Sequence, residues 1–422
     1  MSDRRSACRN EKRDSPVTTA VAGFRALTLV RLAGPAFVAA VAYVDPGNVA
    51  TNFAAGARYG YLLVWVLVGA NLTALLVQYL SAKLTIATGL TLPEMCARRF
   101  GRPARLLLWA QAEIVAMATD LAEVVGGAAA LNLLFGVPLL AGGVFTGLVS
   151  WVVIVVQSRS GQRPFEAVVV ALLAVVSIGF VYDAVGSGAS LGGIASGLAP
   201  RLAGGDSLVL ACGIFGATVM PHAIYLHGAL VRDRHGDTRG RESRLLAATR
   251  FDVLAAMGIA GLVNLAMLVV GAAALTPKAG DSMASSYGEL AATLGQAAAA
   301  FFAFALLASG FASTAVGTYA GAVILEGFLG RAFPLAGRRL ITLVPALVVL
   351  GAGVEPGQAL VISQVVLSFG IPFALWPLVA FTGRRKVMGA LANRAVTTCC
   401  AVLAASASTL FNGAALWFTA MG

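Results

Sequence analysis

Charged residues are scarce in this chain of 422 residues, at 12% of the total, about half the share that is usual in soluble domains. Hydrophobic residues make up 59%, and the mean hydropathy is +0.85. A water-soluble domain of this size cannot hide so much apolar surface, which excludes a soluble enzyme and a disordered chain. The composition therefore indicates a polytopic membrane protein whose spans are all α-helical.

Cysteine and histidine are also rare, at five and three residues. No CxxC pair or metal-finger spacing is present, so we expect reduced, structural thiols. The chain has no GxxxxGK[ST] phosphate-binding loop, which argues against an ATP-driven pump. It has no HExxH motif either, which argues against an intramembrane metalloenzyme. We therefore expect neither an enzyme nor a resident cofactor.

Long apolar runs are abundant, and eleven of them suit a transmembrane helix, which needs about 20 residues. Ala291–Leu325 is long for one span, and Leu340–Ala352 is short unless Arg338 and Arg339 lie within its lower end. The predicted spans are Leu32–Ala55, Tyr61–Ala82, Leu106–Leu134, Leu139–Val156, Ala167–Tyr182, Ser207–Val231, Val253–Ala274, Ala291–Leu325, Leu340–Ala352, Gly357–Phe381 and Ala395–Phe418.

Basic residues predict the orientation of these spans. Alternate loops, together with the N-terminal residues 1–31, carry 27 of the 30 Lys and Arg residues. The positive-inside rule places these loops and the N-terminus in the cytoplasm and the C-terminus outside. Residues 1–31 are polar and basic without an apolar core, so we expect a disordered cytoplasmic tail and not a signal peptide. The net charge of +11 thus marks a membrane side and predicts no nucleic-acid partner.

The first predicted span carries the sequence Asp45-Pro46-Gly47-Asn48 at its middle. Pro46 removes a helical N–H and disfavours helical geometry at Asp45, and Gly47 permits unusual dihedral angles. We expect the helix to break here and to free backbone carbonyls near Ala42 for protein, water or a cation. A simple proline kink is the alternative, but an acid and an amide three residues apart favour a binding site.

The sixth predicted span repeats this pattern, because Met220 comes directly before Pro221 and His222 follows it. A break here would free carbonyls near Ala217. The two breaks lie five spans apart and early in each half of the chain. This offset predicts two inverted five-helix repeats with a substrate site between the broken helices.

The repeats are expected to cover residues 32–182 and 207–381, and residues 395–418 would form an additional eleventh helix. Between the two breaks, Asp45 and Asn48 supply side-chain oxygens, Ala217 a carbonyl, and Met220 a thioether. Oxygens suit hard divalent cations, whereas sulfur favours transition metals, so we predict Mn²⁺ or Fe²⁺ as the substrate. Plain packing of Met220 and a merely structural amide at Gln364 remain open alternatives.

The third predicted span contains three acidic residues, Glu113, Asp120 and Glu123. Charged groups in a membrane mark function by default, so Asp120 and Glu123 are interpreted as part of a proton relay. Arg338 and Arg339, at the base of the ninth span, are potential ion-pair partners. Glu113 lies near the cytoplasmic side, where a solvated or structurally paired group is the preferred interpretation.

At this point the chain resembles the Nramp family of divalent-metal transporters, and specifically its bacterial proton-coupled manganese transporters, over about residues 25–420. The most specific markers are DPGN and MPH. Three longer stretches also resemble family sequences, and all five occur along the chain in the family's order. These sequences are DPGN at 45–48, TDLAEVVGG at 119–127, MPH at 220–222, ASGFASTAVGTYAG at 308–321 and SQVVLSFGIPFAL at 363–375. Many relatives have Asn and Gln where this chain has Ala223 and Ala322, which puts ion preference and coupling in doubt.

The resemblance implies a LeuT-like fold and a set of functional residues. The implied metal ligands are Asp45, Asn48, Met220 and the carbonyl of Ala217, with the carbonyl of Ala42 and Gln364 joining in other conformations. The implied proton-handling residues are Asp45, His222, Asp120, Glu123, Arg338 and Arg339.

Proton-coupled import of Mn²⁺ and Fe²⁺ by alternating access is therefore the expected function. The expected location is the inner membrane of a bacterium, and the expected partners are divalent metal ions, protons and lipid, with the chain as a monomer. An amino-acid or Na⁺ symporter of the same fold is the alternative. That alternative leaves Asp45 without a purpose, because its charge would repel a substrate carboxylate.

Overall fold

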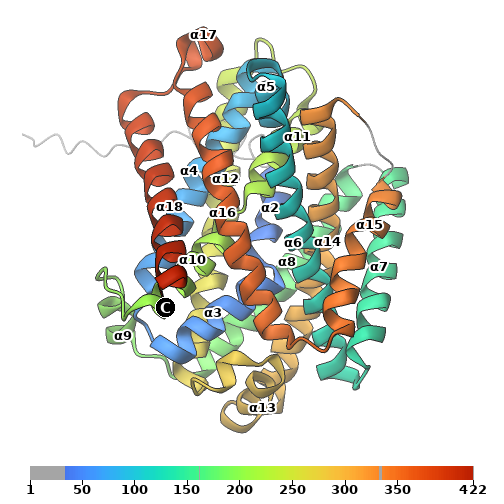
Figure 1. Cartoon of the computed structure of the whole chain (residues 1–422), viewed down its shortest axis with the longest axis vertical. Coiled ribbons are helices and arrows are strands. Elements are labelled where there is room, and N and C mark those ends of the chain that lie inside the picture. Colours follow the sequence, from blue (N-terminus) through green and yellow to red (C-terminus); the bar gives the residue numbers. More distant parts are fainter. Residues whose placement is uncertain (1–33, 161, 332–334, 422) are drawn as a thin grey trace, which may run out of the picture.

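The computed structural model describes residues 34–160, 162–331 and 335–421, and within these ranges it contains helices and no strand. Most of the helices run roughly along one direction and form a single bundle (Figure 1). By length and composition of the described residues, eight helices could cross a membrane. The predicted tail 1–31 lies outside the described residues.

Nine of the eleven predicted spans each correspond to one long helix, with one boundary misplaced. The remaining two, the first and the sixth, are broken as expected. The nine continuous helices are α4 (Val64–Thr88), α6 (Arg102–Phe135), α7 (Leu139–Ser160), α8 (Gln162–Gly186), α12 (Glu242–Ala274), α14 (Gln296–Leu329), α15 (Leu335–Gly351), α16 (Pro356–Thr382) and α18 (Ala395–Met421).

One predicted boundary is wrong. The segment Ala291–Leu325 was expected to be one helix, but its first residues belong to the short helix α13 (Met283–Thr293). Gly295, with a φ of 94°, turns the chain before α14 begins at Gln296. Such a positive φ is easily adopted only by glycine, which explains why the helix cannot run on from 291.

Short helices lie at both ends of the bundle (Figure 1). Two of them, α5 (Leu92–Arg99) and α17 (Arg385–Met388), lie at one end, where the basic loops gather. At the opposite end lies α13. The remaining short elements are α9 (Leu191–Ser196), η2 (Ala279–Asp281) and η3 (Gly389–Leu391).

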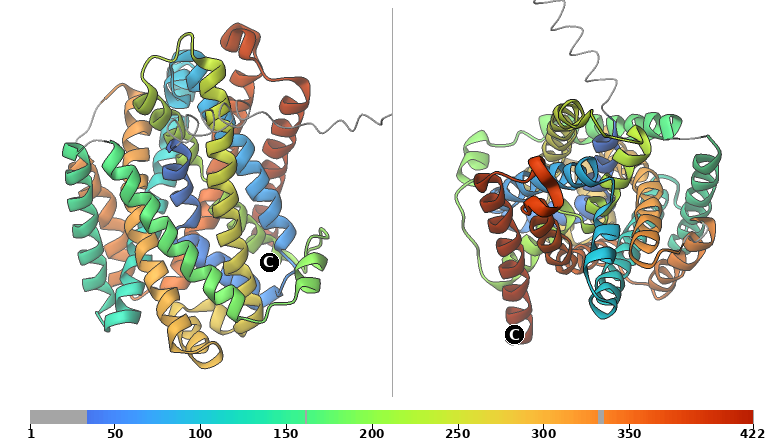
Figure 2. Two further views of the ribbon diagram at one scale, coloured as in Figure 1. Left: turned by 180° about the vertical axis from the view of Figure 1, so that it is seen from behind. Right: turned by 90° about the horizontal axis from the view of Figure 1, so that it is seen from above.

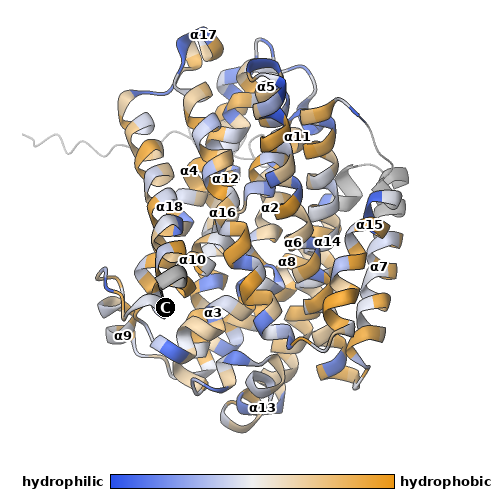
Figure 3. Cartoon of the chain, in the orientation of Figure 1, coloured by the Kyte–Doolittle hydropathy of each residue, from blue (hydrophilic) through white to orange (hydrophobic). Residues whose placement is uncertain are grey.

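Hydrophobic residues predominate along the height of the helices, and hydrophilic residues are more frequent near the ends of the bundle (Figure 3). Many large apolar side chains are exposed, among them Leu107, Ile178 and Leu403. The helix α18 lies at one edge of the bundle beside α16, and only 28% of its apolar window is buried (Figures 1 and 2). The sixth span is the opposite case, with 94% of its window buried. The bundle therefore wraps peripheral helices around the two broken ones.

Glycines bring the first broken span against α12. A Cβ on Gly56 would lie 2.1 Å from the carbonyl oxygen of Leu268, and one on Gly271 would lie 2.7 Å from the carbonyl oxygen of Phe53. Only glycine permits backbones to approach so closely, as in other helix pairs packed within lipid. This contact holds the second half of the first span in position.

Candidate metal site between two broken helices

The first span is broken into α2 (Pro35–Val41), the 3₁₀ turn η1 (Ala42–Val44) and α3 (Pro46–Tyr59). Asp45 separates η1 from α3 in an extended conformation, with φ −77° and ψ 170°. Pro46 occupies the first position of α3, where its missing N–H costs nothing. The sequence thus breaks the helix at the predicted residue.

Asp45 is the N-cap residue of α3. Its Oδ1 accepts a hydrogen bond from the Asn48 backbone N–H at 2.7 Å. Its Oδ2 is buried and has no hydrogen-bond partner among the described residues. One oxygen therefore holds the helix end, and the other remains available to a ligand.

Two side chains from distant helices satisfy two of the carbonyls that the break frees. Asn264 of α12 donates from Nδ2 to the Tyr43 carbonyl at 2.6 Å. Ser309 of α14 donates to the Val44 carbonyl at 2.5 Å. Because unsatisfied carbonyls are costly in lipid, these bonds stabilise the broken geometry.

Asn264 also orients the amide of a predicted ligand. Its Oδ1 accepts hydrogen bonds from Asn48 Nδ2 at 3.0 Å and from Asn52 Nδ2 at 2.8 Å. With its NH₂ group thus engaged, Asn48 keeps its Oδ1 without a partner among the described residues. Sequence reasoning missed Asn264, although a lone amide within the apolar seventh span was the available signal.

The sixth span is broken into α10 (Gly205–Thr218) and α11 (Pro221–His235). Val219 and Met220 link the two halves outside helical geometry, and Met220 is the N-cap residue of α11. The carboxyl end of α10 carries a partial negative charge, which favours a cation nearby. Met220 and Ala217 are fully buried at this point.

Gln364 of α16 lies between the two breaks. A Cβ on Gly47 would lie 1.7 Å from Gln364 Nε2, and a Cβ on Gly216 would lie 2.0 Å from the Gln364 carbonyl oxygen. Gln364 of α16 is therefore in close contact with Gly47, two residues after Asp45, and with Gly216, the residue before Ala217. The structure thus brings the two helix breaks together around this residue.

All six predicted metal-site residues are inaccessible to solvent, since Ala42 is 2% exposed and the other five are 0% exposed. Several buried oxygens here lack a hydrogen-bond partner among the described residues. These oxygens are Asp45 Oδ2, Asn48 Oδ1, Gln364 Oε1 and Thr218 Oγ1. Such a set of unsatisfied oxygens fits a cation, because each would otherwise carry a desolvation cost.

The described residues contain no group of three or more His, Cys, Asp or Glu side chains that could hold a metal ion. A site built here would therefore combine one carboxylate with amide and carbonyl oxygens and a thioether. Such a weakly charged, mixed donor set is suited to holding a transition-metal ion transiently.

The acidic residues of α6 form two ion pairs with α15. Arg339 Nη1 lies 3.2 Å from Asp120 Oδ1, and both residues are buried. Arg338 Nη2 lies 2.6 Å from Glu113 Oε1, and this pair is closer to the end of the bundle. Both arginines thus contact the acids proposed as their partners, and Glu113 is structurally paired as preferred.

Glu123 lies one turn beyond Asp120 and is 1% exposed. Neither of its carboxylate oxygens has a hydrogen-bond partner among the described residues. Glycine makes room for it, because a Cβ on Gly317 of α14 would lie 2.8 Å from Glu123 Oε1. The same face of α6 contacts the first break, where a Cβ on Gly126 would lie 2.1 Å from Pro46 Cβ.

His222 connects the second break to α6. Its Nδ1 is 3.2 Å from the Thr119 hydroxyl, and Thr119 is the residue before Asp120. His222 Nε2 has no partner among the described residues. From Glu123 to Glu113, α6 covers about 15 Å, given its rise of about 1.5 Å per residue. A line of buried polar groups therefore runs along α6 from the breaks toward the end that carries α5.

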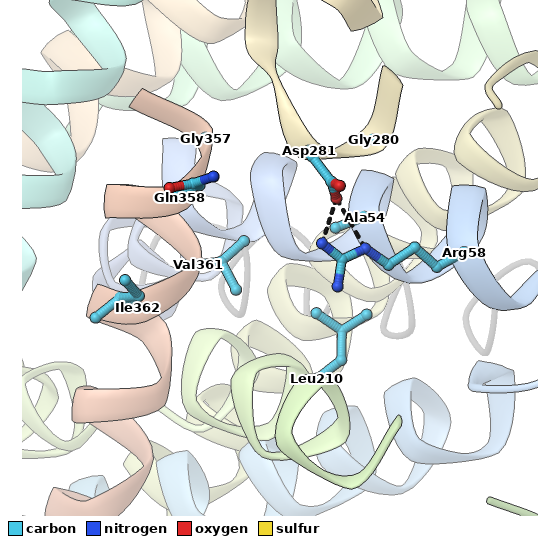
Figure 4. A pocket seen from close by; sticks show the side chains of 9 residues that line it. All are labelled: Ala54, Arg58, Leu210, Gly280, Asp281, Gly357, Gln358, Val361 and Ile362. Carbon is cyan, nitrogen blue, oxygen red and sulfur yellow. Dashed lines mark hydrogen bonds and ion pairs between the residues drawn. The ribbon is translucent and has the colours of Figure 1, made fainter. Parts of the chain in front are cut away.

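A cavity of about 220 Å³ lies at the opposite end of α3, where Arg58 forms an ion pair with Asp281 of η2 (Figure 4). Residues of α3, α10, η2 and α16 line it. These residues are Ala54, Arg58, Leu210, Gly280, Asp281, Gly357, Gln358, Val361 and Ile362. The helices that carry the predicted ligands thus also surround this cavity.

Comparison with known proteins identifies relatives over most of the chain. The sequence profile of natural resistance-associated macrophage protein-like (Nramp) proteins matches residues 36–418. The divalent metal cation transporter MntH of Mycobacterium tuberculosis is 53% identical over 395 residues, which cover 93% of this chain and 92% of that protein.

Solved structures agree with this similarity. The crystal structure of the Eremococcus coleocola manganese transporter, in complex with an aromatic bis-isothiourea substituted compound, superimposes with a TM-score of 0.82. The two are 32% identical in sequence, over 91% of this chain and 86% of that one. Mhp1, a nucleobase-cation-symport-1 family transporter, is only 16% identical over 92% of this chain and 93% of its own, and its TM-score of 0.57 indicates a shared fold.

Proposed function

The chain belongs to the Nramp family, and from this premise we propose that it imports divalent transition-metal ions across the cytoplasmic membrane of a bacterium. The observation that carries the proposal is the buried Oδ2 of Asp45, which has no hydrogen-bond partner among the described residues. It lies at a helix break beside other buried oxygens in the same condition. A divalent cation would satisfy these oxygens together.

The metal ligands proposed are Asp45, Asn48, Met220 and the Ala217 carbonyl, with the Ala42 carbonyl and Gln364 in other conformations. Asp45 is the only one that carries a charge, so it sets most of the affinity for a cation. The thioether of Met220 adds little for Mg²⁺ or Ca²⁺ but favours softer ions. Mn²⁺ and Fe²⁺ are the substrates that best fit this donor set.

Transport proceeds by alternating access between two inverted five-helix repeats, residues 32–182 and 207–381. Complete burial of the ligand positions supports a closed site that opens to one side at a time. The cavity lined by Arg58 and Gln358 suits the approach of the metal ion to the site from the extracellular side. The distribution of basic residues supports a cytoplasmic N-terminus, and residues 395–418 are proposed as an additional helix outside the repeats.

Protons are proposed to move inward along α6. Asp45, Glu123 and Asp120 are the acidic groups, and His222 connects the second break to the same helix through Thr119. Arg339 holds Asp120 by an ion pair, so it orients this part of the route. In this proposal the route is partly separate from that of the metal, because α6 leads away from the breaks.

The membrane potential also favours uptake. A divalent cation that moves to the negative interior gains roughly 4.6 kcal/mol per 100 mV, from about 2.3 kcal/mol for each charge. Import is therefore favourable even before proton coupling adds to it. The chain is proposed to work as a monomer.

An amino-acid symporter of the same fold is the alternative, since the fold alone does not specify the substrate. Here the side chain of Asp45 caps α3, where such a symporter would bind a substrate carboxylate. A second negative charge at this helix end would be repelled. The observed cap therefore favours a cation.

Uptake in proteoliposomes with an inside-negative potential tests the proposal. Mn²⁺, Mg²⁺ and alanine uptake should be compared for the native chain, Asp45→Asn and Asp183→Asn. Asp183 is a matched control, because it is also a buried acid without a hydrogen-bond partner among the described residues, but it lies on α8. We expect Mn²⁺ uptake to fall more than tenfold only in Asp45→Asn. Native Mn²⁺ uptake in Asp45→Asn would refute the site assignment, and alanine uptake would support the alternative.

A further inference from the structure

Positive charges gather around α17, at the end of the bundle that also carries α5 (Figure 1). The segment 382–394 contains four basic residues and no acidic one. Two further basic residues come from α4 and α12. None of these six forms an ion pair with a described acidic residue. They are Lys83, Arg250, Arg384, Arg385, Lys386 and Arg394.

Lys83 is the most buried of these cations, at 9% exposure. Its Nζ donates a hydrogen bond to Asn393 Oδ1 at 2.8 Å, and Arg250 and Arg394 lie close enough to act on its charge. A neutral amide does not compensate a partly buried ammonium that has two cationic neighbours. An anion near Asn393 and Arg394 would offset this concentration of positive charge.

A cavity of about 620 Å³ lies at this position. Asn393 is held firmly at its wall, because its backbone N–H donates to the Thr382 carbonyl and its Nδ2 to the Thr382 hydroxyl, each at 2.9 Å. The lining includes two arginines, one from α17 and one from the residue directly before α18. The lining residues are Arg385, Gly389, Ala390, Ala392, Asn393 and Arg394.

The outer face of α18 begins directly beside this cavity. Val396 is 75% exposed, Leu403 is 63% exposed and Leu410 is 72% exposed, and each lies two turns from the next. In a membrane, lipid chains must cover such an apolar stripe. A lipid on this stripe would place its headgroup at Arg394, only two residues before Val396.

We propose that this cavity binds the phosphate of an anionic phospholipid, such as phosphatidylglycerol, at the cytoplasmic surface of the membrane. Arg385 and Arg394 would hold the phosphodiester by charge-assisted hydrogen bonds, and the acyl chains would lie along α18. Asn393 couples the site to Lys83 on α4. The inference depends on the membrane location of the chain and not on the ion that it transports.

Native mass spectrometry of the full chain, purified in detergent and titrated with phosphatidylglycerol, tests the proposal. The variant R385Q/R394Q should weaken binding of the first lipid roughly ten- to thirtyfold, given about 1 kcal/mol for each basic residue near an anionic membrane surface. R385K/R394K should retain most of the binding. Both arginines are exposed, so the native fold should persist, which size-exclusion chromatography checks.

The matched control is R98Q/R99Q, which removes two exposed positive charges from α5 at the same end of the bundle. It should leave binding of the first lipid unchanged. Equal loss in both variants would refute the site, because the effect would then be that of net charge. Competition by inorganic phosphate as effective as by phosphatidylglycerol would also overturn the proposal, since it would indicate a soluble anion. Phosphatidylcholine should compete poorly.

Discussion

The side chain of Gln364 passes directly over Gly47, so that a Cβ on Gly47 would lie 1.7 Å from Gln364 Nε2 and 2.4 Å from its Cδ. The same residue of α16 contacts α10 through its main chain, at Gly216. These two contacts connect the breaks of the first and sixth spans. Substitution of the two glycines should have different effects, because the side chain of Gln364 can move away from Gly47 but its main-chain carbonyl cannot move away from Gly216.

Gly216→Ala should destabilise the fold strongly, because the new methyl group would overlap the Gln364 carbonyl oxygen at 2.0 Å. We expect a loss of about 1–3 kcal/mol or more, as for other overpacked cores. Thermal unfolding of the detergent-purified protein measures this. Gly258→Ala is the matched control, since nothing lies within 4 Å of its Cβ position. An equal melting temperature for both variants would contradict the packing argument.

Gly47→Ala should instead displace the Gln364 side chain and leave the fold largely intact. Gln364 lies close enough to Asp45 to act on its carboxylate, so we expect weaker Mn²⁺ binding by isothermal titration calorimetry. The double variant Gly47→Ala/Gln364→Ala should bind no more weakly than Gln364→Ala alone. Additive losses would show that Gly47 acts by another route.

Met220→Ala should change ion selectivity more than Mn²⁺ transport. The thioether contributes to binding of transition metals and little to binding of Ca²⁺ or Mg²⁺. We expect Ca²⁺ to compete with Mn²⁺ uptake in proteoliposomes in the variant but only weakly in the native chain. Met267→Ala, in a buried methionine of α12, is the control. Unchanged Ca²⁺ competition in Met220→Ala would refute the role of the thioether.

Asn264→Ala should lower the affinity for Mn²⁺, because Asn48 would lose the hydrogen bond that orients its amide. The expected loss is about five- to twentyfold, since a net hydrogen bond contributes about 1 kcal/mol or slightly more. Asn412→Ala is the matched control. Asn412 is also a buried amide, and it connects α18 to Ser368. Asn412→Ala should lower the stability of the fold but leave the affinity for Mn²⁺ unchanged. An equal loss of Mn²⁺ affinity in the two variants would contradict the prediction.

Glu94 should make stability depend on pH. Burial raises the pKa of this carboxyl, but hydrogen bonds from the Thr91 backbone and from Arg232 outweigh it and hold the pKa below its ordinary value of 4.5. Because the folded pKa is the lower one, the carboxylate stabilises the fold above pH 4.5. This contribution is lost as the pH falls through the folded pKa.

Glu94→Gln should therefore lower the stability by about 1 kcal/mol at pH 7, and the difference from the native chain should shrink at lower pH. Thermal unfolding at pH 7 and pH 4 measures both values. Glu289→Gln is the control. The carboxylate of Glu289 accepts a hydrogen bond from the Thr276 backbone at the opposite end of the bundle and does not contact Arg232. A difference between native chain and Glu94→Gln that grows on acidification would contradict the sign.

Local chemistry in the sequence was enough to predict both helix breaks. Pro46 and Pro221 each begin a new helix, because proline lacks an N–H and restricts the residue before it. Proline alone is not sufficient, since Pro345, Pro372 and Pro377 lie inside continuous helices. The apolar runs likewise predicted the helices, with one boundary misplaced at Gly295. These features depend on neighbours in the chain, and so the sequence by itself determined them.

Tertiary structure decided which distant groups meet. Asn264 contacts Tyr43 and Asn48 across more than 200 residues, and Arg338 and Arg339 each select a different acid on α6. No periodicity or motif encodes such pairings, because they depend on how helices cross. The sequence determined where the helices break and which candidate ligands lie beside the breaks. Only the packing of α6, α12 and α16 around the breaks decided which buried oxygens lack a hydrogen-bond partner. The physical reason is that a buried polar group stays without a partner only when no neighbouring helix supplies one.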